Sequence, residues 1–327
     1  MSSSVEHVGA GCHAWLRLPG SWGETNIGLV CGDGASLLVD TPWDHRLTLS
    51  MLEAFRPELE KAPVAIVFNT HADPDHWWGN ADLPSAEVVA SDATASAMRH
   101  EPTPRQLQSM RQLSQVGGRL PGRAGRGGRY VGEMLAPFAF EEVTLRFADR
   151  TFTDRRTETV GGREIELIDY GPAHTVSDSV VFVPDARVVY TGDLLFAGVT
   201  PVMWHGPVTA WLAVLEAIMA LEADVFVAGH GRVSGRAELA ALRDYWGWLA
   251  SAVQEHQGAG VGASEMATRL ADSQEFAAFR GWVSPERLWI NVATIDRQLR
   301  GEGPIPTNAV ARGRAFDGVA GLAHHLG

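Results

Sequence analysis

The chain has 327 residues, of which 45% are hydrophobic and 20% are charged, a balance typical of a folded globular protein. Its formal net charge is −12, from 27 basic and 39 acidic side chains. This charge argues against general binding to nucleic acid or to anionic membranes, since both need clustered positive charge. We therefore expect no nucleic-acid and no membrane partner.

The location of the protein follows from what the sequence does not contain. No apolar run reaches the roughly 18 residues of a membrane-spanning helix, and the N-terminus lacks the basic start and apolar stretch of a signal peptide. A cytoplasmic protein is expected. Cys12 and Cys31 could pair, but two reduced, partly buried thiols are the simpler interpretation.

The N-terminal part alternates strand and helix patterns. The β-rich runs 26–33 and 35–42 are separated by a glycine-containing hairpin signal. A helix follows them, with Asp44 as its N-cap. The continuous apolar run 64–69 predicts a strand buried on both faces, and 86–90 is the next expected strand.

Residues 100–135 differ in composition from the segments around them, because prolines, arginines and glycines gather there. We predict an insertion within 100–140, made of a short helix at 105–114 and then a mobile loop. A solvated loop and a lid over a substrate both stay open, since long loops in compact domains are often functional.

Strands are expected again at 142–148 and 164–170, and two apolar runs around residues 184–186 predict a hairpin. A helix at 209–222 and a strand at 224–229 come next. The remaining third reads as helical, with helices expected at 234–256, 263–271 and 284–299.

This order of elements predicts an α/β protein in which two similar halves pack sheet on sheet, with helices outside. We divide the chain into a domain of residues 1–260 and a C-terminal helical extension of residues 261–327 that packs on it. The last twenty residues contain Gly and Pro and are expected to be ordered only by docking.

A polar cluster follows the apolar strand 64–69. It places His71, Asp73, Asp75 and His76 within six residues at the end of that strand. Imidazole and carboxylate together suit a divalent metal ion, and rigid sheets commonly hold functional loops at such ends. A hydrogen-bonded turn is the alternative interpretation of this cluster alone.

Three later strands end in the same way. His174 follows strand 164–170, Asp193 follows the run 187–191, and His230 follows strand 224–229, each beside small residues. Small residues allow backbones to approach closely. Four strand ends with ligand-type side chains therefore predict one convergent site.

The ordered motifs THxxxDH, GPAHT, TGD and GHG resemble those of the metallo-β-lactamase-fold superfamily, over about residues 12–250. The resemblance implies an αββα sandwich of two packed sheets with outer helices and a dinuclear metal site at the sheet edge. It also implies the ligands: His71 and His174 for the first ion, Asp75, His76 and His230 for the second, and Asp193 between them. Asp40 resembles the acid that orients a ligand in this family; a turn cap is its other interpretation.

The sequence departs from the family pattern at Asp73, where the family usually has a histidine. A carboxylate there shifts metal preference from zinc towards iron, manganese or magnesium. The diiron flavoproteins of the superfamily also carry an acid, a glutamate, at this position. Asp73 is predicted as a ligand; in the alternative it lies outside the ligand set and leaves one metal only.

The resemblance implies a metallohydrolase with two divalent ions, zinc first and iron or manganese as alternatives. Asp75 and Asp193 are then catalytic, and a metal-bridging hydroxide attacks an ester, thioester or lactone of a small acyl-type substrate. The sequence looks most like bacterial cyclase or thioesterase-like members, including polyketide-type cyclases. Trp78, Trp204 and His205 are candidates for the substrate pocket.

Two other functions stay open beside hydrolysis: a diiron-type redox enzyme on the same fold, and a non-catalytic metal-binding homologue. Asp73 motivates the first of these. A homodimer is compatible with the sequence.

Overall fold

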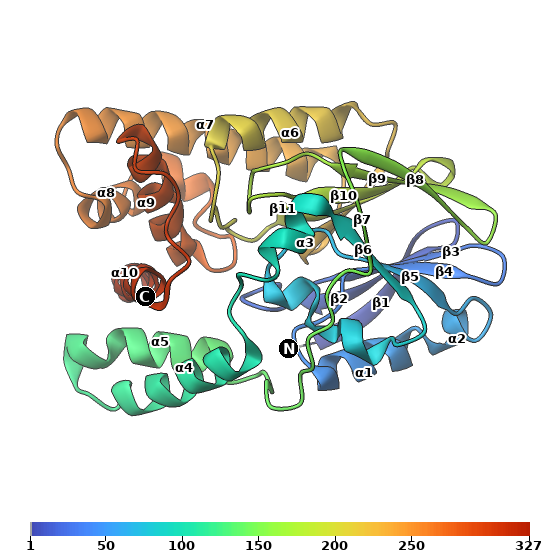
Figure 1. Ribbon diagram of the computed structural model, residues 1–327. Helices are drawn as coiled ribbons and strands as arrows, with labels where there is room; N and C mark the ends of the chain where they lie inside the picture. The colour runs from blue at the N-terminus through green and yellow to red at the C-terminus, as the bar shows by residue number, and fades with distance from the viewer. Residues whose placement is uncertain (1) are drawn as a thin grey trace.

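The structure is a computed structural model that describes residues 2–327, without the side chains of residues 2 and 309. Two mixed sheets pack face to face (Figure 1). The first has the strand order β1-β2-β3-β4-β5-β6-β7. Its strands are Ser2–Gly9, Cys12–Leu18, Ile27–Cys31, Ser36–Val39, Val64–Phe68, Glu87–Ser91 and Arg150–Phe152.

The second sheet has the order β13-β12-β11-β10-β9-β8. In chain order its strands are β8 Arg155–Val160, β9 Arg163–Asp169, β10 Ser179–Val183, β11 Val188–Ala197, β12 Val225–Gly231 and β13 Val233–Ser234. Three of the four strands that lead to or contain the motif residues pair in parallel with a neighbour, β5 with β4 and β6, and β11 with β12. The carboxyl ends of these three strands therefore meet at one edge of the sandwich. The fourth, β9, pairs antiparallel with β8 and β10.

Helices cover the outer face of each sheet. Figure 1 shows α1 (His45–Ala54) and α2 (Arg56–Leu59) on the first sheet, and α6 (Val208–Ala220) and α7 (Arg236–Gly258) on the second. Asp44 caps α1, as expected, by accepting a hydrogen bond from the Leu47 N–H at 2.8 Å. The layers are helix, sheet, sheet and helix, so the predicted αββα class is confirmed.

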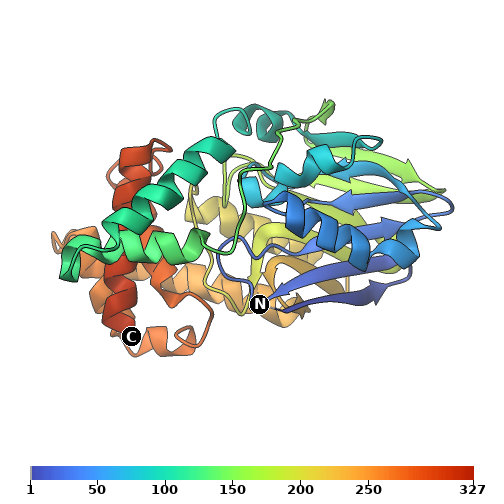
Figure 2. The ribbon, with the colours of Figure 1, turned by 90° about the horizontal axis from the view of Figure 1, so that it is seen from below.

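The remaining helices gather at one end of the sandwich, where α4 and α5 lie beside the C-terminal helices (Figure 2). Short α3 (Asp92–Ala97) follows β6. The helices at that end are α4 Pro104–Gly117, α5 Arg126–Leu135, α8 Ala263–Ala271, α9 Leu288–Leu299 and α10 Ala309–Leu326. None of the helices within residues 2–327 is both long and apolar enough to cross a membrane.

Short 3-10 helices occupy several of the connections. They are η1 Pro74–His76, η2 Trp78–Asp82, η3 Gly122–Gly125, η4 Pro184–Ala186, η5 Glu275–Ala278 and η6 Pro285–Arg287. η1 carries two of the motif residues, and η6 starts the approach to α9.

Two expectations about single elements were wrong. Residues 142–148 form no strand, because the alternating side chains of Val143, Leu145 and Phe147 pack into an aromatic cluster without any strand beside them. The expected mobile loop contains α5 and so is in large part helical. The last residues form α10, which packs against α5 and α9; that they are ordered only by this docking stays a prediction.

Glycine explains why α5 was missed. A Cβ on Gly128 would lie 2.6 Å from the backbone N of Gly118, so glycine here allows the segment after α4 to pack closely against α5. Val131 and Leu135 on the same helix are buried. The lid role of this insertion and the division at residues 260 and 261 stay predictions.

Candidate metal centre

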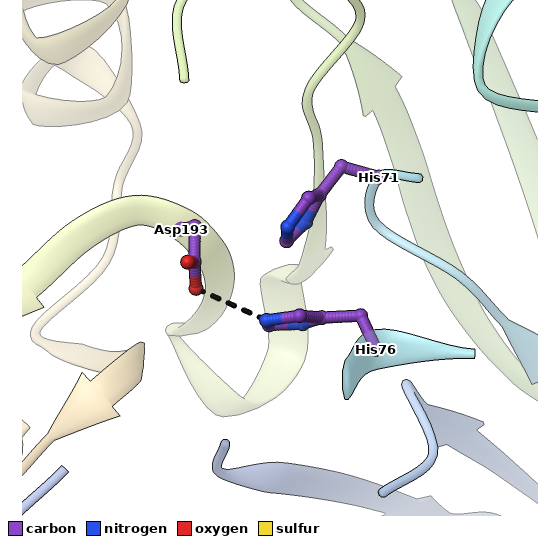
Figure 3. Close-up of side chains that lie close together, drawn as sticks. All are labelled: His71, His76 and Asp193. Atoms are coloured by element: carbon purple, nitrogen blue, oxygen red, sulfur yellow. Dashed lines mark ion pairs between the residues drawn. The ribbon is translucent and has the colours of Figure 1, made fainter. Parts of the chain in front are cut away.

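The polar side chains that follow β5 and β9 converge with Asp193 and His230, as the motif pattern predicted, although these two lie inside β11 and β12 rather than after them. The structure brings together three groups whose ligand atoms lie within 4.8 Å of one another. The groups are His71, His76 and Asp193; His71, Asp73 and His174; and Asp75, His76 and His230. Figure 3 shows Asp193 facing the rings of His71 and His76 from the opposite sheet.

Asp193 lies between the groups. Its Oδ1 is 3.3 Å from His76 Nε2, and its Oδ2 is 3.3 Å from His230 Nε2 and 3.5 Å from His174 Nε2. One carboxylate therefore reaches ring nitrogens of three histidines, as a bridging ligand must.

Hydrogen bonds fix the tautomer of two histidines. Asp40 accepts from the Thr70 hydroxyl at 2.8 Å, so the same hydroxyl accepts from His71 Nδ1 at 2.9 Å. Asp40 also accepts from His76 Nδ1 at 2.8 Å. With the proton on Nδ1, the Nε2 lone pair of each ring is free to bind a cation.

Asp40 thus orients two candidate ligands, which is the role that the family resemblance implied. It is buried and takes a left-handed backbone conformation with φ 66°. Such a conformation is uncommon outside glycine but is tolerated by aspartate. The strain places its carboxylate where it also accepts from the Thr70 N–H at 2.7 Å.

His174 is oriented in the same manner from another direction. Its Nδ1 donates to the Val202 carbonyl at 2.6 Å, which leaves Nε2 facing Asp73 and Asp193. Asp178 accepts hydrogen bonds from the N–H groups of Ala173 and Thr175 and so holds the loop that carries His174.

The electrostatics of the cluster suit a cation. Burial holds the pKa of His71 well below its usual value, so its ring is neutral. Burial opposes ionisation of Asp193, but the imidazoles of His230 and His76 hold its pKa well below the ordinary range. Neutral imidazole and ionised carboxylate are the forms that bind metals, so His71 and Asp193 already have them. Burial lowers the pKa of His76, but Asp193, Asp40 and Asp75 raise it well above its usual value, so His76 releases a proton when a cation binds.

Buried polar atoms without a hydrogen-bond partner indicate whether this cluster of residues could bind a metal ion. Within residues 2–327, His71 Nε2, His76 Nε2 and Asp193 Oδ1 are buried and have no hydrogen-bond partner. Leaving such atoms unpaired costs about 1–3 kcal/mol each. All three point into the same cluster, so four imidazoles and three carboxylates form a donor set that fits two divalent ions.

Asp73 belongs to this cluster. Its Oδ2 lies 3.1 Å from His174 Nε2 and accepts a hydrogen bond from Trp204 Nε1 at 3.2 Å. Burial opposes the charge of Asp73, but His174 lowers its pKa below the usual value. The carboxylate therefore stands, ionised, where the family usually has a histidine.

Thr25 and Asn26 support the site from the start of β3, and the sequence analysis missed both. Thr25 donates to Asp75 Oδ2 at 2.8 Å. Asn26 donates to the carbonyls of Ala228 and Gly231 and so ties β3 to the strand end that carries His230. No motif marks these residues, because their role arises only when the two sheets pack.

The three pocket candidates lie in different surroundings. Trp78 is 2% exposed and packs among Trp43, Trp77 and Phe140. Trp204 is half-buried and contacts the metal ligands through Asp73. His205 is also half-buried, and its backbone N–H donates to the His174 carbonyl at 3.1 Å.

The chain is similar to two curated proteins of larger size. One is the 2,4-dinitroanisole O-demethylase subunit alpha of a Nocardioides species, 25% identical over 238 residues, which are 70% of this chain and 60% of that protein. The other is a linear primary-alkylsulfatase of a Pseudomonas species, 28% identical over 218 residues, 61% of this chain and 40% of that one. The chain thus spans less than two thirds of the length of these relatives.

Among solved structures, the stereoselective inverting sec-alkylsulfatase Pisa1 from Pseudomonas sp. has the same fold. It superposes with a TM-score of 0.69 at 18% identity, over 90% of this chain and 50% of that one. The model of the metallo-beta-lactamase superfamily matches residues 20–230, which include all seven candidate ligands. The chain therefore belongs to the metallo-beta-lactamase superfamily.

Proposed function

We propose that this chain is a dinuclear metal-dependent hydrolase that cleaves an ester-type bond in a small molecule. One observation carries the proposal: the buried Nε2 atoms of His71 and His76 lie beside Asp193 without a hydrogen-bond partner, while the Nδ1 atom of each ring is hydrogen-bonded. A site arranged only for stability would pair these atoms instead.

Two divalent ions bound there would supply Lewis acidity and would activate water near neutral pH. The protein's own part is positioning. Asp193 spaces the two groups of ligands, and Thr25 holds the partly exposed Asp75 where its carboxylate can accept a hydrogen bond from a water and take up its proton.

Zinc is the ion proposed first, because imidazole nitrogens dominate the donor set. Asp73 adds an oxygen donor beside His71 and His174, which makes iron or manganese the alternatives. Elemental analysis of protein purified without added metal decides between these ions and gives their number per chain.

The substrate class is proposed from the relatives, whose names include an O-demethylase and an alkylsulfatase. The first name describes a methyl ether and the second a sulfate ester, so both describe a bond to oxygen in a small molecule. An oxygen ester is the first choice because the second name describes one. Thioester hydrolysis, lactone hydrolysis and a polyketide-type cyclisation are alternative reactions for the same site. The names of the relatives do not favour these three reactions.

The test compares turnover of 4-nitrophenyl acetate, S-phenyl thioacetate and 4-nitrophenyl sulfate by the metal-loaded protein. We expect at least one to be hydrolysed, and Asp75→Asn and Asp193→Asn each to lower that rate by roughly 100-fold or more while the fold persists. Asp33→Asn, at an exposed acid, is the control. Unchanged rates in both site variants would refute the proposal.

Asp73 also supports a second candidate, a diiron-type redox enzyme, because its carboxylate lies within the ligand group of His71 and His174. Oxygen uptake by iron-loaded protein, lost in Asp73→Ala, would favour it. Iron-loaded protein that consumes no oxygen but hydrolyses an ester would leave only the first proposal.

A further inference from the structure

Near the metal centre, an arginine of the C-terminal segment lies over the ring of each of two tryptophans. Trp22 and Trp204 have ring centroids 6.4 Å apart. The guanidinium of Arg287, in η6, lies 4.2 Å from the Trp22 ring centroid, and that of Arg312, in α10, lies 3.6 Å from the Trp204 ring. We name these four residues the tryptophan–arginine wall.

The wall touches the metal centre at Trp204, whose Nε1 donates to the Asp73 carboxylate at 3.2 Å. Arg312 thus lies over the face of the indole ring whose N–H group binds this candidate ligand. Its charge acts on Asp73, as the pKa shifts of both groups show. At the other end, Arg287 lies 6.0 Å from the ring of Phe196, which stacks on His230.

The two arginines differ in their burial and in their hydrogen bonds. Arg287 is 1% exposed and donates to the Thr200 carbonyl at 3.2 Å, so it is part of the packed structure. Arg312 is half-buried and, among the residues that the structure describes, forms no hydrogen bond or ion pair. Burial lowers the pKa of Arg312, while the charges of Asp73 and Glu101 oppose this.

A guanidinium removed from much of its water and left without a hydrogen-bonding partner is costly, unless a ligand supplies acceptors. An aromatic ring beneath a guanidinium restricts its motion without using its N–H groups, and a planar guanidinium can donate to two oxygens of an anion at once. Glu101 is the nearby acid, and it does not approach Arg312 within 4.0 Å among the described residues.

The charge around the centre also favours an anion. Two divalent ions would outweigh the three carboxylate ligands, and Arg312 adds positive charge beside Asp73. This local charge contrasts with the net charge of −12 of the whole chain. An anionic substrate would therefore be attracted specifically to this part of the surface.

We propose that Arg312, held over the ring of Trp204, binds an anionic group of the substrate beside the bond that the metal centre cleaves. The ligand chemistry is a sulfate-like or carboxylate group with two or more acceptor oxygens, attached to an apolar chain that can lie against the tryptophans. This inference rests on the proposed hydrolase function for the cleavage step, but the recognition of the anion can be measured without it.

The test measures binding to the metal-loaded protein by calorimetry, with octane-1-sulfonate and octanoate as unreactive probes and octan-1-ol as the neutral probe. For Arg312→Met we expect affinity for at least one anion to fall about tenfold or more, with little change for the alcohol. Arg314→Met, an exposed arginine on the same helix, is the matched control and should keep wild-type affinity. The anion that is affected more identifies the group as sulfate-like or carboxylate.

Arg312→Lys serves as the second variant if the methionine variant does not fold. Lysine keeps the charge but loses the planar fork, so binding should still weaken by about threefold or more. Anion affinity equal to wild type in the folded variants, or no anion binding by the wild-type protein, overturns the inference. Loss of anion binding in Arg312→Met with no ester turnover by any variant would instead overturn the hydrolase proposal alone.

Discussion

Gly229 lies directly beside Asp193 and leaves no space there for a side chain. A Cβ added there would lie 2.0 Å from Asp193 Oδ1, far inside contact distance. We therefore expect Gly229→Ala to displace Asp193 and to lower metal affinity by roughly 10–100-fold or more. Metal content after dialysis against a weak chelator measures this.

The control for that change is Gly235→Ala, since nothing lies within 4 Å of a Cβ at Gly235. The control should retain its metal. Full metal content in Gly229→Ala would mean that Asp193 can move without loss and is not a bridging ligand.

The two cysteines provide a test that depends on pH. Both are free; Cys12 is buried, and burial raises its pKa to about 11, while burial also raises the pKa of the more accessible Cys31. Only the thiolate reacts, so at pH 8 about one Cys12 in a thousand is reactive. In alkylation followed by mass spectrometry, Cys31 should react first, and the rate at Cys12 should rise about tenfold per pH unit below pH 11.

Cys31→Ser is the control for this experiment, because it should remove the faster reaction and leave the slow one. Equal alkylation rates at the two cysteines near neutral pH, or an alkylation rate at Cys12 that does not change with pH, would contradict the burial and the raised pKa of Cys12.

At the scale of single residues, the sequence was informative where chemistry is local. His71 and His76 stand in one short motif at a strand end, and the structure brings their rings within 4.0 Å. Thr25 and Arg312 carry no such pattern, because each reaches the centre from a segment far away in the chain. Their positions depend on tertiary packing alone.

At the scale of elements, the two sheets are held in close contact by a glycine. A Cβ on Gly28 of β3 would lie 2.4 Å from the ring of Tyr190 on β11, whose hydroxyl donates to the His13 carbonyl at 3.0 Å. Gly28→Ala should therefore overpack the core between the sheets and lower the free energy of unfolding by about 1–3 kcal/mol. Urea unfolding followed by fluorescence measures the change.

Gly247→Ala in α7 is the matched control, as its Cβ meets nothing within 4 Å and the helix favours alanine. It should be neutral or stabilise by up to about 1 kcal/mol. Equal stability of the wild type and Gly28→Ala would show that the sheets can separate slightly at no cost.

Elements were predictable where hydrophobic period and turn chemistry agreed. The hairpin around residues 184–186 and helix α8 at Ala263–Ala271 formed as expected. The alternating pattern at 142–148 was misleading because its side chains pack on aromatic rings with no partner strand. The arginine- and glycine-rich α5 was missed because its stability comes from packing against α4 and α10 rather than from helix propensity.

At the scale of the whole molecule, a buried asparagine connects the C-terminal helices to the loop beside the metal centre. Asn291 of α9 accepts from the Met203 N–H at 2.8 Å and donates to the Pro201 carbonyl and the Tyr245 hydroxyl, each at 2.9 Å. Between those two anchored positions lies the Val202 carbonyl, the acceptor for His174 Nδ1. The helical segment thus helps to set the tautomer of a candidate ligand.

This connection predicts that Asn291→Leu affects both stability and metal binding. The side chain is similar in volume, but the Met203 N–H and the Pro201 carbonyl lose their buried partner, at a cost of about 1–3 kcal/mol each. As the loop relaxes, Val202 no longer holds the His174 ring, and metal affinity should fall by roughly 10-fold or more. Asn308→Ala, which removes the exposed N-cap of α10, should cost about 1 kcal/mol and leave metal affinity unchanged. Calorimetric metal titration of both variants separates the effects: if Asn291→Leu is less stable but binds metal like the wild type, the helices support the fold without positioning His174.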